Sequence, residues 1–152
     1  MAEIQNTFKE LLKNTIAPKL RTHSLKGSGQ NYSIDSDSHW ALIGIQKSMY
    51  SDSLSLKFTV NLYVVPKEQW GKVKDERSYF PVKPAANVSW GIGWSKRIGN
   101  LLPENLDYWW SLDSETDLNN LANEVIDTIC NKAVPAINEQ IKIPNSSFKR
   151  DA

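Results

Sequence analysis

Hydrophobic and polar residues alternate most regularly between positions 54 and 64. The apolar positions of this stretch are Leu54, Leu56, Phe58, Val60, Leu62 and Val64. A period of two predicts a β-strand that turns one face to a hydrophobic core. The apolar stretch from His39 to Tyr50 comes just before it, separated by the short loop from Ser51 to Ser53. The two stretches therefore predict an antiparallel hairpin.

Both ends of the chain show helical spacing instead. Apolar residues recur every three or four positions from Ile4 to Ile16, and again from Leu118 to Ala133. This spacing predicts an amphipathic helix at each end. Pro18 and Pro135 each come two residues after these patterns. We expect Pro18 to kink or interrupt the first helix, and Pro135 to kink the second helix or to start a final turn. We expect Asp113 or Ser114 to cap the second helix.

Three shorter stretches complete the predicted sheet. Residues 32–34 follow a glycine turn and form a short strand. Residues 88–94 alternate between bulky apolar residues and serine or glycine, and residues 108–112 are rich in aromatic residues. We expect a strand in each, with the apolar positions of 108–112, beginning with Tyr108, pointing inward. Residues 66–86 contain three prolines among charged residues and predict a long connection.

The order of helix, strands and helix predicts an α+β domain. Its sheet is an antiparallel meander of four to five strands, with the N-terminal and C-terminal helices packed on one face. We expect one domain over residues 1–144 and a disordered tail over residues 145–152.

The same periodicity defines the side chains on the opposite, outer face of the sheet. If Trp110 points inward, its neighbour Trp109 points outward, because successive strand residues face opposite sides. Glycines at 44, 91 and 93 would form a floor that allows close approach. The candidate binding residues of this face and its border are Trp40, Gln46, Asn61, Tyr63, Arg97, Asp107 and Trp109.

Two interpretations of this outer face are open. An apolar patch with polar neighbours is typical of a surface that binds a ligand or partner. Alternatively, the tryptophans lie across the neighbouring glycines, or the 66–86 connection, with Trp70 and Phe80, folds over them.

Charge and cysteine content limit the function classes. The chain has 18 basic and 17 acidic residues, for a formal net charge of +1. This balance favours neither nucleic acid nor an anionic membrane as a partner. The N-terminal stretch lacks the apolar core of a signal peptide, and the single cysteine, Cys130, suits a reducing compartment. We therefore expect a cytoplasmic protein.

Catalytic and metal-binding patterns are weak. His23 and His39 have no cysteine or carboxylate at ligand spacing, so we expect no metal site, and no pattern indicates a cofactor. One enzymatic alternative gathers Arg97, Asp107 and His39 from separate strands into a site for a small substrate. Alternatively, Arg97 and Asp107 form a structural ion pair that closes a turn.

Several segments together resemble a known family. They are FKELLKNTIAPKL, IQKS with FTVNLYVV, and SWGIGWSKRIGNLLPENLDYWWSL. In this combination the chain is similar to the bacterial family called domain of unknown function 4304, over about Phe8 to Ile137. The most specific part is Arg97-Ile98-Gly99-Asn100-Leu101, followed by Asp107 and the Trp109-Trp110 pair. Ser24-Leu25 replaces the usual Gly-Phe, a departure that affects packing. The resemblance implies a single-domain bacterial protein and assigns no reaction.

Three functional hypotheses follow. The first is a non-catalytic binding domain that uses the aromatic outer face on an unknown protein or small molecule, for example as an immunity- or inhibitor-type protein. The second is the enzyme described above. The third is a homodimer formed through the sheet face or an edge strand.

Overall fold

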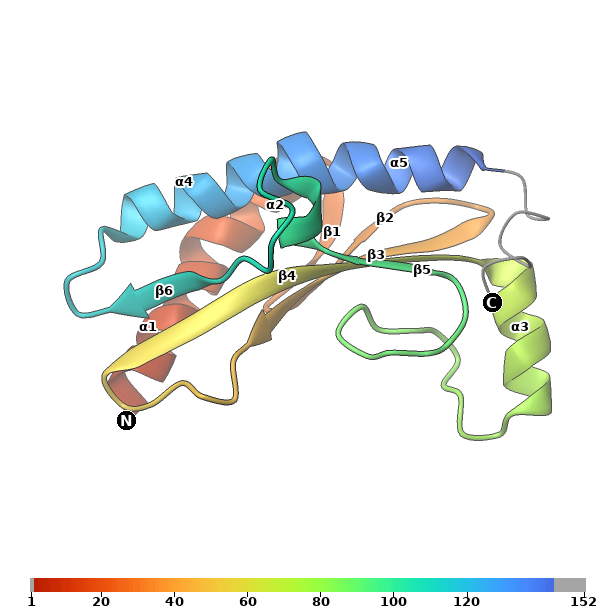
Figure 1. Ribbon diagram of the computed structural model, residues 1–152, viewed down its shortest axis with the longest axis horizontal. Helices are drawn as coiled ribbons and strands as arrows, with labels where there is room; N and C mark the ends of the chain where they lie inside the picture. Colours follow the sequence, from red (N-terminus) through yellow and green to blue (C-terminus); the bar gives the residue numbers. More distant parts are fainter. Residues whose placement is uncertain (1, 144–152) are drawn as a thin grey trace.

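The computed structural model of the chain describes residues 2–143. A six-stranded antiparallel sheet carries the two terminal helices on one face (Figure 1). The predicted α+β class and the placement of these helices are therefore confirmed. The predicted disordered tail at residues 145–152 lies outside the described residues.

Both terminal helices run through their prolines with one widened turn. The N-terminal helix consists of α1 (Ala2–Leu11), the π turn η1 (Leu12–Ile16) and α2 (Ala17–Thr22). The C-terminal helix consists of α4 (Leu118–Thr128), the π turn η3 (Ile129–Ala133) and α5 (Val134–Lys142). A proline ring crowds the carbonyl four residues earlier, and a π turn relieves that contact. Asp117, instead of the predicted Asp113 or Ser114, caps α4 by accepting a hydrogen bond from the Asn120 N–H at 3.1 Å.

The sheet is built around its longest strand, β4. Its strands are β1 (Leu25–Ser28), β2 (Asn31–Ile34), β3 (His39–Lys47), β4 (Ser55–Pro66), β5 (Trp94–Arg97) and β6 (Trp110–Asp113). The first four pair in sequence order, whereas β5 and β6 share the free edge of β4. Leu54, which we expected in the strand and facing the core, precedes β4 and is exposed.

The main core lies between the sheet and the terminal helices. Alternate residues of β3 and β4, among them Ile43, Ile45 and Phe58, are buried there. The Phe58 ring lies 5.1 Å from Phe8 of α1 and 5.6 Å from Trp110 of β6. Burying each large apolar side chain contributes about 1.5–3 kcal/mol, so this contact set fixes the register and therefore the residues of the outer face.

The predicted strand at 88–94 is wrong. Gly91 and Gly93 both have φ of +79°, in the left-handed region that an extended strand does not use. The chain is irregular there, and β5 begins only at Trp94.

Half of the outer sheet face is covered. The connection beyond β4 forms a ten-residue helix, α3 (Lys67–Glu76), and an irregular stretch to residue 93, here called the cover segment (67–93). Figure 1 shows it below the sheet, opposite the terminal helices. Within the cover segment, Trp70 is buried, stacked on Phe80 at 4.7 Å and met edge-on by Trp90 at 5.0 Å. The connection therefore covers Tyr63 and packs against Trp40, but this second core does not include Trp109, so the predicted covering of the outer-face tryptophans is met only in part.

Candidate functional site

The other half of the outer face carries a continuous set of polar contacts. We call this set the polar network, and its members are Gln46, Asn61, Asn87, Arg97, Asp107 and Trp109. The strand register explains why Gln46, Asn61 and Arg97 meet. Gly44 lies opposite Asn61, and Asn61 lies opposite Arg97 on the next strand. Gln46 is two residues beyond Gly44 and so emerges on the same face.

Arg97 is the hub of the network. Its Nε donates to Asn61 Oδ1 at 3.1 Å, and its Nη2 donates to Gln46 Oε1 at 3.3 Å. Its Nη1 lies 3.4 Å from Asp107 Oδ2. The planar guanidinium presents donors in a fixed fork, which suits three acceptors placed around its edge. The Arg97 side chain is 34% exposed, so the hub is open to solvent on one side.

Trp109 and Asp107 form the outer border of the network. The Trp109 indole donates to Asp107 Oδ2 at 2.8 Å, and the Arg97 guanidinium lies 5.2 Å from the centre of the indole ring. Asp107 Oδ2 thus accepts hydrogen bonds from both the Trp109 indole and the Arg97 guanidinium. The Arg97–Asp107 ion pair alone is worth about 0–1 kcal/mol at this exposure, but together the contacts fix the direction of the indole ring.

The excursion between β5 and β6, residues 98–109, places these two residues. Ile98 is fully buried in the main core. A Cβ added to Gly99 would collide with the Leu106 carbonyl and lie 2.7 Å from the Tyr108 nitrogen. The buried Thr59 hydroxyl donates to the Tyr108 carbonyl at 2.7 Å and draws the chain back to β4. The Arg-Ile-Gly segment therefore combines one network residue with two residues that close the loop.

The predicted strand at 108–112 needs one correction. It begins at Trp110, which points inward together with Leu112, as expected. Tyr108 does not point into the core, because it precedes the strand and is 38% exposed.

Asn87 belongs to the network, although sequence reasoning missed it. Its Oδ1 accepts from Asn61 Nδ2 at 2.9 Å, and its Nδ2 donates to the Ile45 carbonyl at 3.2 Å. It lies so close to Gly44 that any Cβ at that position would collide with its side chain. A glycine in the middle of a strand signals such an approach, but it does not say which residue approaches. Asn87 thus links the cover segment to the polar network.

Two predicted binding residues lie elsewhere. Tyr63 is 1% exposed beneath the cover segment, and this burial raises the pKa of its phenol. Trp40 is half-buried at the edge of the second core, with Lys67 Nζ 4.7 Å from its ring centre. Neither joins the polar network. The expected floor of three glycines under the tryptophans is not formed either, since Gly44 lies under Asn87 and Gly93 lies against Tyr63.

The structure does not bring His39 to Arg97 and Asp107. Arg97 lies level with Gly44 of β3, because both residues pair with Asn61 of β4. His39 begins β3, five residues before Gly44, and this separation is roughly 16 Å along a strand. Its Nδ1 lies 2.7 Å from the Ser38 hydroxyl, and burial lowers the pKa of its ring. The proposed catalytic trio is therefore not assembled.

An open groove borders the network on the side of the β3–β4 loop. It has a volume of about 710 Å³ and is lined by Gln46, Asp107 and Trp109 together with residues 47–50 and Lys57. Met49 is 85% exposed and Tyr50 is 86% exposed. Trp109 thus shares the groove with two large side chains that are almost fully exposed.

Three further findings concern possible metal ligands, long apolar helices and the thiol of Cys130 in residues 2–143. Within them, no three histidine, cysteine or carboxylate side chains gather as metal ligands would. None of the described helices has the length and apolar character required to span a membrane. Burial, with a smaller effect of Asp127, raises the pKa of the half-buried Cys130 thiol, which disfavours the reactive thiolate.

The fold and the network define a small α+β domain with a half-covered sheet and a preformed polar and aromatic surface. The sequence pattern of one family, described as Domain of unknown function (DUF4304), matches residues 16–139. The chain belongs to this family, as the resemblance of its Arg-Ile-Gly and Trp-Trp segments indicated. No curated protein and no solved structure matches the chain.

Proposed function

We propose that this chain is a non-catalytic protein-binding domain. Its docking surface consists of the polar network and the adjoining groove residues Met49, Tyr50 and Lys57. The observation that carries the proposal is the groove itself, where the fixed Trp109 ring stands beside the highly exposed Met49 and Tyr50.

The residue types support a protein partner. Tryptophan, tyrosine, methionine and arginine are enriched in the centres of protein interfaces. Here Trp109, Tyr50, Met49 and Arg97 occur together around one groove and its border. Large apolar side chains at this exposure gain contact area when a partner covers them.

The fixed geometry of the surface also supports binding. Trp109 is held by Asp107 and lies against Arg97, which in turn bonds to Gln46 and Asn61. Side chains that are ordered before binding lose less conformational entropy when the complex forms. In contrast, Asp107 is engaged by Arg97 and Trp109, and His39 lies at the other end of β3, so the network offers no matched acid and base.

The charge of the surface favours an acidic partner. Lys57 lines the groove and is exposed, and Asp107, the one acidic residue among the lining residues, is paired with Arg97. An immunity- or inhibitor-type protein, which neutralises its target by covering it, is one protein of this kind. We place this interaction in the cytoplasm of a bacterial cell, because the single cysteine suits a reducing compartment and the family resemblance implies a bacterial protein.

Site-specific crosslinking tests the docking surface. A photo-reactive phenylalanine analogue replaces Tyr50 in one variant and Tyr79 in another, and both are irradiated in lysate of the cells that produce the protein. Tyr79 is the matched control, because it is 74% exposed but lies on the cover segment away from the groove. We expect a discrete adduct at position 50 and none at position 79.

Charge reversal tests whether the positive charge of the docking surface contributes to binding. Lys57→Glu, combined with the probe at position 50, should reduce the adduct, whereas Lys132→Glu on the C-terminal helix should leave it unchanged. Equal adducts at positions 50 and 79, or none at position 50, contradict the proposal. An adduct of twice the chain mass identifies a second copy of the chain as the partner and favours the homodimer hypothesis. Sedimentation at several protein concentrations then tests whether the chain dimerises.

A further inference from the structure

Another cleft lies under the cover segment, next to Asn87 of the docking surface but lined by other residues. It separates the β1–β2 hairpin from residues 81–90 and has a volume of about 670 Å³. This is within the range of about 300–1,000 Å³ that small-molecule sites occupy. Leu42 and Ser33 contribute to its floor, and none of the six polar-network residues lines it.

One wall of the cleft is apolar and held in place. Trp90 lines it, and the Trp90 indole donates to the Ala85 carbonyl at 3.0 Å. The Trp90 ring also meets Trp70 at 5.0 Å and Phe80 at 5.3 Å, both nearly edge-on. The wall is thus formed before any ligand enters, which favours binding of a flat, rigid ring.

The backbone behind this wall is fixed as well. The Trp70 indole donates to the carbonyls of Pro81 and Val82, at 3.1 Å and 3.2 Å. Pro81 and Pro84 both line the cleft, and their rings restrict the backbone further.

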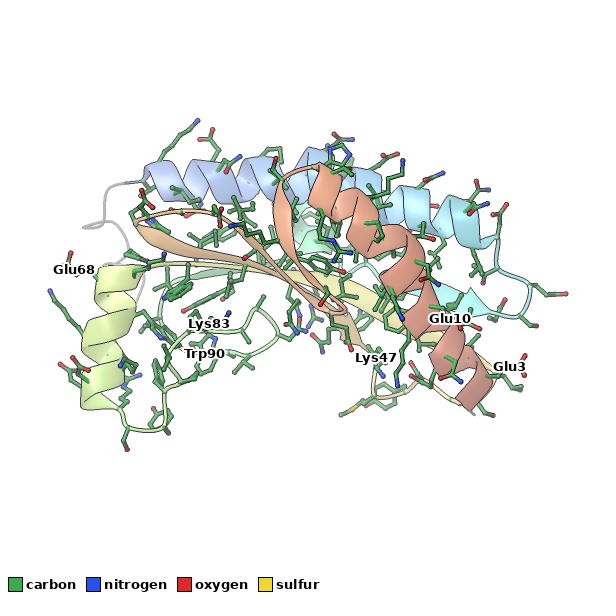
Figure 2. The ribbon with its side chains drawn as sticks, turned by 180° about the vertical axis from the view of Figure 1, so that it is seen from behind. Glu3, Glu10, Lys47, Glu68, Lys83 and Trp90 are labelled. Atoms are coloured by element: carbon green, nitrogen blue, oxygen red, sulfur yellow. The ribbon has the colours of Figure 1, made fainter. Side chains whose placement is uncertain are left out.

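The charged side chains of the cleft are both cationic. Lys26 and Lys83 line it, and none of its lining residues is acidic. Lys26 is paired with Asp35 at 2.8 Å. Among the salt bridges of the described residues, none involves Lys83. Figure 2 shows Lys83 beside Trp90 on the cover segment, so a cation without an ion pair adjoins the aromatic wall.

We propose that this cleft binds a small amphipathic acid, a flat apolar ring system that carries one carboxylate. The ring lies against Trp90, Pro81 and Leu42, and the carboxylate pairs with Lys83. The apolar contacts supply most of the affinity, because an exposed ion pair adds little. The charge selects the acid over neutral or cationic molecules of the same shape.

Titration with 1-naphthaleneacetate tests the cleft in the full chain. The two-dimensional nitrogen–proton NMR spectrum follows the Trp90 indole, which Trp90→Phe assigns. We expect a saturable shift of this signal. Lys83→Met should weaken binding by roughly threefold to fivefold, the contribution of one exposed ion pair. Lys132→Met, which removes a lysine far from the cleft, should leave binding unchanged.

A neutral probe of the same shape isolates the charge. We expect 1-naphthaleneacetamide to bind more weakly than the acid to the wild-type chain, and equally to the wild type and Lys83→Met. Ser33→Phe, verified as folded by its NMR spectrum, fills the floor of the cleft and should abolish binding of both probes.

Three results would each overturn the proposal. They are a Trp90 signal that does not move with the acid, equal affinity for acid and amide, and binding that persists in Ser33→Phe. These outcomes do not bear on the proposed docking surface, since the crosslinking at position 50 reports on residues outside the cleft.

Discussion

The hydroxyl of Tyr63 donates a hydrogen bond of 2.7 Å to the backbone carbonyl of Ile92. This bond joins the middle of β4 to the cover segment, at a point where Tyr63 is 1% exposed. The cover segment therefore depends on a specific buried contact as well as on the stacking of Trp70, Phe80 and Trp90.

Tyr63→Phe should lower the free energy of unfolding by about 1–2 kcal/mol, because the Ile92 carbonyl loses its side-chain donor in a buried place. Urea denaturation followed by tryptophan fluorescence measures the change. An unaltered midpoint would mean that water replaces the hydroxyl, and that the cover segment is held by apolar packing alone.

Tyr32→Phe should have the opposite effect. The Tyr32 hydroxyl is buried in the main core and has no hydrogen-bond partner among the described residues. Removing it should raise the free energy of unfolding by up to about 1 kcal/mol, because a buried polar group without a partner carries a desolvation cost. The same urea titration compares the two variants. A Tyr32→Phe chain less stable than the wild type would contradict this prediction.

Two glycines with the same backbone angle should respond differently to alanine. Gly91 and Gly93 both have φ of +79°, so alanine strains both by about 1 kcal/mol. At Gly93 an added Cβ would also lie 2.8 Å from the Tyr63 hydroxyl and 2.9 Å from the Val64 carbonyl, whereas at Gly91 nothing lies within 4 Å. Gly93→Ala should therefore cost roughly 2–4 kcal/mol.

Thermal unfolding of the two variants checks this difference, with Gly91→Ala as the matched control for backbone strain. Equal melting temperatures would mean that Tyr63 moves aside without cost, and that the close packing of Gly93 does not hold the cover segment.

The large-scale architecture could be predicted because it depends on periodicity. The alternation between residues 54 and 64 identified β4, and the helical spacing identified both terminal helices. Once these were known, the pleat alone placed Gln46 and Asn61 outward on the same face. The strand register then brings Arg97 opposite Asn61.

The cover segment could not be predicted in the same way. Trp90, Ile92 and Trp94 alternate with small residues, a pattern typical of a strand. Gly91 and Gly93 adopt positive φ in the structure, Gly93 against Tyr63, and such a contact between distant residues leaves no mark in local spacing. Asn87 meets Asn61 across 26 residues of chain for the same reason. The covered half of the sheet is thus a tertiary effect that overrides a local preference.

The pH dependence of stability should contain a contribution from His39. Burial lowers the pKa of the folded-state ring below its ordinary value of 6.5. Above about pH 7 the ring is neutral in both the folded and the unfolded chain, so it contributes nothing. As the pH falls below 6.5, the unfolded chain binds a proton more readily, and stability decreases until the folded-state pKa is reached.

An NMR titration of the His39 ring checks the direction of the shift. Urea denaturation at pH 7 and pH 5 should show a smaller loss of stability in His39→Gln than in the wild type. A folded-state His39 pKa above 6.5 would contradict this prediction.

The polar network should distinguish arginine from lysine at position 97. A lysine side chain there would keep the charge, but its single ammonium has no fork with which to reach Asn61, Gln46 and Asp107 together. Arg97→Lys should therefore lower the free energy of unfolding by about 1–2 kcal/mol, whereas Lys96→Arg at the neighbouring exposed position should change it by less than about 0.5 kcal/mol.

The Trp109 indole signal in NMR provides the specific measurement, because Arg97 packs against this ring and shares Asp107 Oδ2 with its N–H. We expect that signal to shift and broaden in Arg97→Lys and to stay in place in Lys96→Arg. An unperturbed Trp109 signal in Arg97→Lys would mean that Asp107 orients the indole without Arg97, and the docking surface would then depend on the 98–109 excursion instead of the hub.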